Sequence, residues 1–209
     1  MTKRESQKKI DEEYNAILAS IVPRENMFSL PSLEETYSTL EPHVHEDGLR
    51  EYGEFQRRVI IPKNVFYPCG DMDITPVRAF PNSRVVLLDK NEHAVNALKR
   101  SGIGAICQDI RDYRPSDKHD LLILLNPQIH SDLASKHIVN GGYILANNYH
   151  ASARQLLENP ENYDLTGAFE ESTLLLNGDK KYNSRKVAEK IEAGVDGLYL
   201  FRKLGGKLK

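Results

Sequence analysis

Short apolar runs alternate with amphipathic stretches through the middle of this chain. Between residues 64 and 146, five runs rich in Val, Ile and Leu end at small, polar or acidic residues, and segments with helical spacing separate most of them. This alternation predicts parallel strands joined by helices, since such strands are covered on both faces and need long crossovers. The expected strands cover residues 64–67, 84–88, 105–108, 120–125 and 142–146, and the expected helices cover 75–80, 91–100 and 131–139.

The C-terminal part follows a different pattern. A helix over residues 151–158 is followed by two expected strands, 165–169 and 197–201, with 174–176 as an optional extension of the first. A charged helix over 184–192 separates them. Two closing strands after five alternating units predict an antiparallel edge on a mostly parallel sheet. We therefore expect a doubly wound α/β fold with about seven strands.

The N-terminal region is expected to be helical. Apolar side chains recur there at helical spacing: Ile10, Tyr14, Ile17, Leu18 and Ile21. This spacing predicts an amphipathic helix that ends near Pro23, and a second helix follows in which Ser32 is the expected cap. Residues 41–58 are polar without alternation, and we assign no element to them. The expected division is a helical appendage over 1–60 and an α/β domain over 61–209.

Composition narrows the class of protein. The 209 residues are 40% hydrophobic and 28% charged, which fits one globular domain with an appendage. The net charge of −2 gives no general attraction to nucleic acid or to an anionic membrane, so neither is an expected partner. No apolar run reaches the ~20 residues that span a bilayer. Two isolated cysteines, Cys69 and Cys107, form no disulfide framework or zinc site, and we expect a cytoplasmic location.

Acidic residues follow two of the expected strands. Asp89 ends the second strand and Asp109 follows the third. In open parallel sheets, ligands bind at the carboxyl ends of the strands. A carboxylate suits vicinal hydroxyls because it can accept two hydrogen bonds at once. These two acids are therefore the expected contacts of a cofactor that carries adenosine.

With this element order and these acids, the chain resembles the class I S-adenosylmethionine-dependent methyltransferases from residue 64 to its end. In that family a Gly-rich turn follows the first strand, the acid ending the second binds the ribose hydroxyls, and the acid after the third meets the adenine. Asp89 falls 20 residues after Cys69 (89 − 69 = 20), the usual offset of such an acid from the turn. The resemblance implies that S-adenosylmethionine is the cofactor and that Asp89 and Asp109 hold its adenosine.

The segment from Tyr67 to Asp73 takes the place of the Gly-rich turn. The resemblance implies that Tyr67, Cys69, Gly70, Asp71 and Asp73 contact the cofactor. The sequence departs from the family here, because only Gly70 is a glycine and Tyr67 stands where many members carry an acid. Asp71 and Asp73 attract the sulfonium and ammonium groups of the methionine moiety, and they would repel a dinucleotide pyrophosphate. A nicotinamide dehydrogenase is therefore the least favoured of the functions considered.

The ends of the fourth and fifth strands are the expected acceptor side. Asn126 begins an Asn-Pro-Gln-Ile segment that resembles the Asn-Pro-Pro-aromatic motif of amino-methylating members, although the second proline and the aromatic residue are missing. Tyr149 and His150 follow the fifth strand and are expected to face the same cleft. An imidazole at neutral pH can serve as a general base. We therefore expect Asn126, Tyr149 and His150 to be the catalytic residues.

Each of these residues also has a purely structural interpretation. Asp89 can cap the following helix, Asp109 can be an ordinary loop acid, and Asp71 and Asp73 can complement a helix dipole. Asn-Pro is a common turn signal, and a polar histidine in a loop is often only solvated.

One histidine pair raises the question of a metal. His43 and His45 alternate and are followed by Glu46 and Asp47, so the imidazoles can point the same way on an extended segment. No third ligand cluster lies nearby in the sequence, and we assign no metal site.

Two functions remain open. The first is an enzyme that transfers a methyl group from S-adenosylmethionine to an unidentified small-molecule acceptor. The second is a methyltransferase-like domain that has lost transfer and serves as a binding or regulatory module, which the poor Gly-rich turn would explain.

Overall fold

A computed structural model describes residues 32–125 and 127–205. Its eight strands are β1 Asn64–Pro68, β2 Arg84–Asp89, β3 Ala105–Cys107, β4 His119–Leu124, β5 Ile138–Ala146, β6 Tyr163–Glu170, β7 Thr173–Leu176 and β8 Tyr199–Lys203. Its described helices are α2 Leu33–Thr39, α3 Glu46–Arg58, α4 Thr75–Ala79, α5 Glu92–Arg100, α6 Ser131–Ser135, α7 Ser152–Leu157 and α8 Ser184–Glu192. The predicted helix around residues 10–21 lies outside the described residues.

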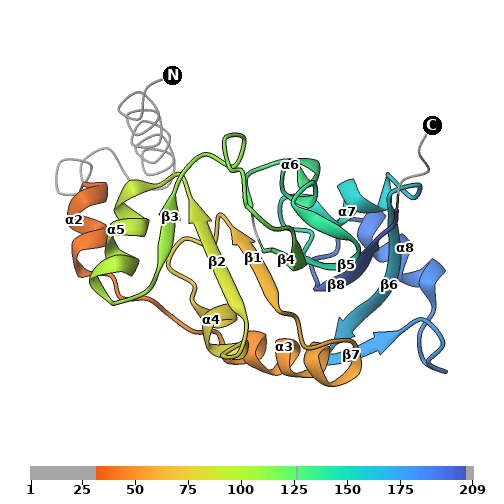
Figure 1. Ribbon diagram of the computed structural model, residues 1–209. Helices are drawn as coiled ribbons and strands as arrows, with labels where there is room; N and C mark the ends of the chain where they lie inside the picture. The colour runs from red at the N-terminus through yellow and green to blue at the C-terminus, as the bar shows by residue number, and fades with distance from the viewer. Residues whose placement is uncertain (1–31, 126, 206–209) are drawn as a thin grey trace, which may run out of the picture.

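The strands form a single sheet in the order β3-β2-β1-β4-β5-β8-β6-β7 (Figure 1). The first five strands are parallel, and β8 is inserted antiparallel between β5 and β6. The predicted mostly parallel α/β sheet with an antiparallel edge is confirmed. The strand count rises from about seven to eight because residues 174–176 do not extend β6. They form β7, which turns back against β6 as a hairpin through Glu171 and Ser172.

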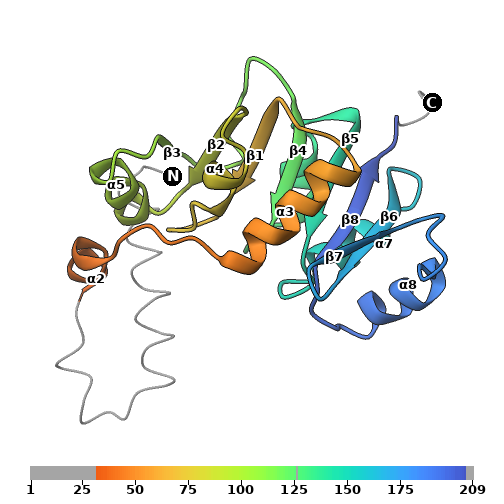
Figure 2. The same ribbon diagram turned by 90° about the horizontal axis from the view of Figure 1, so that it is seen from below.

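Helices cover both faces of the sheet. On one face, α6, α7 and α8 pack on the cluster that contains Phe66, Leu122 and Phe201. On the other face, α3, α4 and α5 lie over Val65 and Leu121. Figure 2 shows α3 running across this second face. Because both faces are covered, the central strands carry continuous apolar runs, such as residues 121–124 of β4, and these runs are the pattern that predicted them.

Helix α3 lies in a stretch for which no element was predicted. Most of its side chains are polar, but Tyr52 and Phe55, three positions apart, are completely buried against the sheet. Its C-terminal end is fixed by Arg58, whose guanidinium donates to the Asp179 carboxylate just after β7 at 2.9 and 3.0 Å. Two aromatic side chains among many charged ones gave too weak a hydrophobic periodicity to predict a helix here. The helix lies within the predicted N-terminal region, yet it belongs to the core of the sheet.

The start of α2 matches the prediction, and the end of α6 does not. Helix α2 begins at the predicted cap: the Ser32 hydroxyl accepts from the Glu35 N–H, and the Glu35 carboxylate accepts from the Ser32 N–H. The helix predicted over 131–139 is too long, since α6 ends at Ser135. Residues 138–139 instead begin β5, where Ile138 is buried and pairs with His119 of β4.

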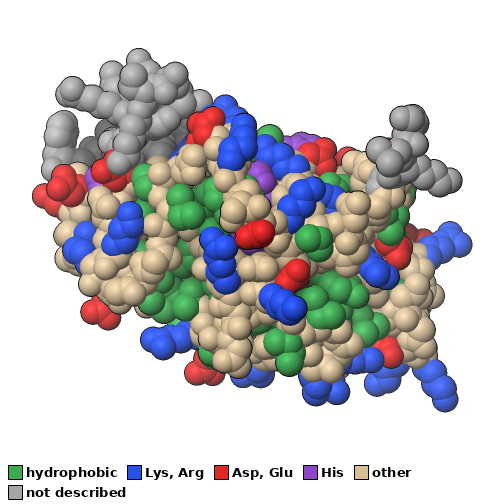
Figure 3. Space-filling view, viewed as in Figure 1, with side chains coloured by type: hydrophobic (Ala, Val, Ile, Leu, Met, Phe, Trp, Pro, Cys, Tyr) green, Lys and Arg blue, Asp and Glu red, His purple; other side chains and the backbone are tan. Residues whose placement is uncertain are grey.

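The surface carries charges of both signs. On the face drawn in Figure 3, Lys and Arg side chains are interspersed with Asp and Glu side chains, in keeping with the net charge of −2. Among the described residues, no helix combines the length and apolar character needed to cross a membrane.

Candidate functional site

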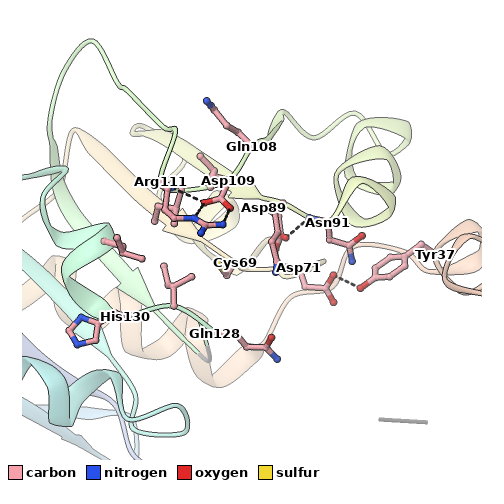
Figure 4. A pocket seen from close by; sticks show the side chains of 15 residues that line it. Tyr37, Cys69, Asp71, Asp89, Asn91, Gln108, Asp109, Arg111, Gln128 and His130 are labelled. Carbon is pink, nitrogen blue, oxygen red and sulfur yellow. Dashed lines mark hydrogen bonds and ion pairs between the residues drawn. The ribbon is translucent and has the colours of Figure 1, made fainter. Parts of the chain in front are cut away.

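A pocket of about 580 Å³ opens at the carboxyl ends of β1, β2 and β3 (Figure 4). Its walls come from the turns that follow these strands and from the segment between β4 and α6, which contributes Gln128, Ile129 and His130. The volume lies within the range of about 300–1,000 Å³ that is usual for small-molecule and cofactor sites. Of the predicted cofactor contacts, the structure brings together Cys69, Asp71, Asp89 and Asp109 in this lining.

The turn after β1 is tight although it contains only one glycine, Gly70. Cys69 and Asp71 adopt φ angles of 57° and 49°, in the left-handed region that usually favours glycine. Gly70 is required for another reason, because a Cβ there would lie 2.6 Å from Cε1 of the Tyr67 ring. The Asp73 N–H then donates to the Gly70 carbonyl at 2.9 Å and closes the turn. The turn therefore keeps a compact backbone without the family's glycines.

Asp89 faces the pocket from the end of β2. Its Oδ1 accepts from the Asn91 N–H at 2.8 Å, and its Oδ2 accepts from the Asp71 N–H at 3.3 Å. Burial raises the pKa of this carboxyl, the hydrogen bond from Asn91 opposes the shift, and the charge of Asp71 adds to it. The alternative of Asp89 as a helix cap is wrong, since Asn91 caps α5 by accepting from the N–H groups of His93 and Ala94.

Asp109 is held by an arginine that the sequence prediction missed. Arg111 donates from Nε to Oδ1 at 2.9 Å and from a terminal nitrogen to Oδ2 at 2.5 Å. This guanidinium lowers the pKa of Asp109 to about 2. Both residues line the pocket, so it presents a planar guanidinium beside the carboxylate. The ion pair could have been predicted from the sequence, because Arg111 follows Asp109 by two residues.

Tyr37 of α2 also reaches the pocket and was not predicted. Its hydroxyl donates to Oδ1 of Asp71 at 2.7 Å, and Arg100 of α5 donates to its backbone carbonyl at 2.7 Å. Burial, followed by the Asp71 contact, raises the pKa of the phenol well above its ordinary value. Helix α2 therefore forms part of the pocket wall.

The remaining predicted cofactor contacts lie behind this wall. Tyr67 is buried under the turn, and its hydroxyl donates to Oδ2 of Asp73 at 2.9 Å. Gly70 and Asp73 line a small adjoining cavity rather than the main pocket. Cys69 does reach the pocket, but burial and then the charge of Asp89 raise the pKa of its thiol to about 12. A thiol in that state is not a nucleophile at neutral pH.

Two of the predicted catalytic residues, Tyr149 and His150, do not line the pocket. Tyr149 is 67% exposed and packs edge-on against His150, with ring centroids 4.8 Å apart. Neither residue is part of the pocket lining as described. Asn126 lies outside the described residues. The catalytic roles of these three residues remain predictions.

Comparisons with solved structures identify the architecture. The chain superposes on the N-methyltransferase NodS from Bradyrhizobium japonicum WM9 in complex with S-adenosyl-L-homocysteine, with a TM-score of 0.50 and 14% sequence identity. The superposition covers 81% of this chain and 92% of NodS. It also superposes on the plantazolicin methyltransferase BpumL in complex with a triazolic desmethylPZN analog and SAH, with a TM-score of 0.51 and 13% sequence identity. This superposition covers 95% of this chain and 99% of BpumL.

A third similarity is to aTrm5 in its complex with tRNALeu, with a TM-score of 0.51 and 18% identity over 78% of this chain and 47% of that one. No protein-family model and no curated protein sequence matches the chain. The similarity is therefore one of architecture at low identity, and the chain has a class I methyltransferase-like fold.

Proposed function

We propose that this protein binds S-adenosylmethionine in the pocket at the ends of β1, β2 and β3 and transfers its methyl group to a small-molecule acceptor. The observation that carries the proposal is the Asp89 carboxylate at the end of β2. Two backbone N–H groups orient it from the neighbouring turns, and it lines the open pocket. This is the position and residue type that would accept hydrogen bonds from ribose hydroxyls.

The other lining residues fit the same cofactor. Ile110 and Leu133 give the pocket an apolar wall. Gln108 also lines the pocket, although its Nε2 already donates to the Asp112 carbonyl at 3.1 Å. The guanidinium of Arg111 can stack on a purine ring. Asp71 supplies negative charge toward the methionine end. Structures of fold neighbours in complex with S-adenosylhomocysteine support this choice of ligand.

When bound, the cofactor would supply an electrophilic methyl group, and the protein would contribute mainly by positioning the reactants. Holding two reactants in line converts a bimolecular step into an effectively unimolecular one. Asn126, Tyr149 and His150 are the proposed acceptor-side residues, with His150 as a general base that removes a proton from the acceptor. The cytoplasmic location, the small-molecule acceptor and the absence of a nucleic-acid partner remain predictions.

A second function is favoured by one observation. Arg111 already occupies the Asp109 carboxylate with two hydrogen bonds, in the position where the family's acid meets the adenine. A methyltransferase-like binding or regulatory module would tolerate this pairing more readily than an enzyme that must turn over its cofactor.

Calorimetric titration with S-adenosylhomocysteine tests the first proposal. We expect Asp89→Ala to weaken binding at least about tenfold, since it removes the acceptor of charge-assisted hydrogen bonds worth about 1.5–3 kcal/mol. Asp112→Ala is the matched control, because this exposed acid lies near the pocket without lining it. Circular dichroism should show both variants folded. Equal affinity in Asp89→Ala and wild type would sink the assignment, and a wild type that binds neither cofactor nor product would favour the binding module.

A further inference from the structure

Three potential metal ligands converge beside the turn after β1. The ligand atoms of His43, His45 and Asp73 all lie within 4.8 Å of one another. We propose that these three side chains bind one divalent transition-metal ion of the zinc type. This site does not rest on the proposed methyl transfer, because it uses none of the residues that line the cofactor pocket.

The backbone holds the three residues in place. His43 pairs with Asp73 in a parallel β-bridge, in which the His43 N–H donates to the Met72 carbonyl at 3.0 Å and the Ile74 N–H donates to the His43 carbonyl at 2.9 Å. The His45 N–H donates to the Thr75 hydroxyl at 2.9 Å. Alternate residues of an extended segment point to the same side. The segment before α3 is therefore fixed on both sides of the proposed ion.

Asp73 is oriented as a metal-binding carboxylate usually is. The Thr75 N–H donates to its Oδ1 at 2.7 Å, the Thr75 hydroxyl donates to the same atom, and the Tyr67 hydroxyl donates to Oδ2 at 2.9 Å. A carboxylate has about four lone-pair sites, so these three hydrogen bonds leave one on Oδ2. Such outer partners orient ligands and strengthen metal binding.

A buried hydroxyl points to a missing ligand at the same place. Tyr52 of α3 has no exposed surface, and its hydroxyl has no hydrogen-bond partner among the described residues. Tyr52, His45 and Asp73 all line one cavity of about 460 Å³, together with Leu125 at the carboxyl end of β4. A buried unsatisfied hydroxyl costs about 1–3 kcal/mol. Water or another ligand bound to the ion would give it a partner.

The charges around this cavity favour a cation. Glu46, Asp47 and Glu51 line it, with Asp47 paired to Arg50, and burial raises the pKa of Glu51 to about 7. The excess of negative charge attracts a divalent ion. These acids support the site electrostatically, while the two imidazoles and Asp73 supply its ligand atoms.

The donor set selects the class of metal. Two imidazole nitrogens with one carboxylate oxygen suit Zn²⁺, Co²⁺ or Fe²⁺, whereas Mg²⁺ and Ca²⁺ prefer oxygen ligands throughout. A tetrahedral zinc site needs ligand atoms about 3.3 Å apart, given bonds of about 2.0–2.1 Å. His43 and His45 are exposed, so small rotations of their rings can close the gap from 4.8 Å. Three protein ligands would leave one coordination position open to the cavity.

The sequence alone had no third ligand for this histidine pair. Asp73 lies 30 positions from His43 (73 − 43 = 30), and only the β-bridge brings them together. Asp73 also lines the small cavity that Asp89 lines.

Titration of the untagged full chain with Co²⁺, followed by visible absorption and by competition with Zn²⁺, tests the proposal. We expect one equivalent to bind and to give the intense bands of a four-coordinate site. His43→Ala and His45→Ala should each weaken binding at least about tenfold, and the double variant should abolish it. His93→Ala, at a partly exposed imidazole of α5 outside both proposed sites, is the matched control for adventitious binding and should keep wild-type affinity.

Asp73→Asn tests the carboxylate, but it also disturbs the hydrogen bonds to Thr75 and Tyr67 and can cost stability. The two exposed histidines keep the test decisive, since their removal breaks no described backbone contact. Lack of stoichiometric binding by the wild type, or wild-type affinity in the His43→Ala/His45→Ala double variant, would overturn the metal site. A parallel titration with S-adenosylhomocysteine in metal-free buffer separates this outcome from failure of the cofactor proposal.

Discussion

The turn from β1 to α4 and the turn from β2 to α5 line the same pocket, yet their backbones are built differently. In the second turn, Asn91 has an extended backbone and its side chain caps α5 in the ordinary way. In the first turn, Cys69 and Asp71 take left-handed conformations without being glycines. A left-handed conformation costs a non-glycine residue roughly 1–2 kcal/mol, so the first turn depends on support from its surroundings.

That support comes from the end of β2, where the second turn begins. The Cys69 N–H donates to the Leu88 carbonyl at 2.8 Å, and the Asp71 N–H donates to the Asp89 carboxylate. Asp89 accepts from both turns at once, since its other oxygen accepts from Asn91. A poor match to a glycine motif therefore does not exclude a functional turn, provided that neighbouring groups hold the backbone in place.

The largest effect is expected from Gly70→Ala in the first turn. The new Cβ would lie 2.6 Å from the Tyr67 ring. The hydrogen bond from the Tyr67 hydroxyl to Asp73 holds this ring in place. Overpacking of this kind costs about 1–3 kcal/mol, and the displaced turn should also lose cofactor binding. Urea unfolding and calorimetry measure the two consequences.

Gly53→Ala is the matched control for that change. Gly53 is an exposed residue within α3, and a Cβ there meets nothing within 4 Å. Alanine should stabilise the helix by about 0.5–1 kcal/mol. Equal stability effects of the two substitutions would contradict the role assigned to Gly70.

A smaller effect is expected from Asn91→Ala in the second turn. The substitution removes the side chain that accepts from the N–H groups of His93 and Ala94, and loss of such a cap costs about 1 kcal/mol. Asn91→Asp should keep nearly full stability, because aspartate caps equally well. If both variants unfold at the same urea concentration, capping is not what Asn91 contributes.

The smallest expected effect is on pH dependence through Asp89, which joins the turns. The pKa of its carboxyl is raised in the free protein, so its contribution to stability is present below the unfolded value of about 3.9 and is lost as the pH rises through the raised pKa. Cofactor affinity should change in the opposite sense, because the ionised carboxylate is the acceptor of the ribose hydroxyls.

Binding of S-adenosylhomocysteine should therefore be weaker at a pH below the raised pKa of Asp89 than at a pH above it. Calorimetry at the two pH values measures the difference, and Asp89→Asn should remove it. A pH dependence that survives in Asp89→Asn would assign the titration to another group.

Local signals explain which parts of the fold were predictable. The strands β2 and β4 and the helices α5 and α8 follow from continuous apolar runs, caps and helical spacing, which act over a few residues. Helix α3 escaped because its contacts with the sheet rest on two aromatic side chains among charged neighbours.

The candidate site was predictable only where one residue at a strand end determines it, as for Asp89. The contact of Tyr37 with Asp71 and the pairing of His43 with Asp73 join positions at least 30 residues apart, with no local signature. The left-handed turn was also missed, because its residue types disfavour the conformation that its surroundings enforce.

The position of β8 has a consequence for how the protein reaches its fold. β8 pairs with β5 on one side and β6 on the other, whereas β6 and β7 precede it along the chain. During synthesis, the hairpin of β6 and β7 is therefore complete before the strand that connects it to the rest of the sheet has been made. Until residues 199–203 emerge, one edge of β6 and one edge of β5 lack their partner strand, and exposed strand edges of this kind are where folding intermediates aggregate.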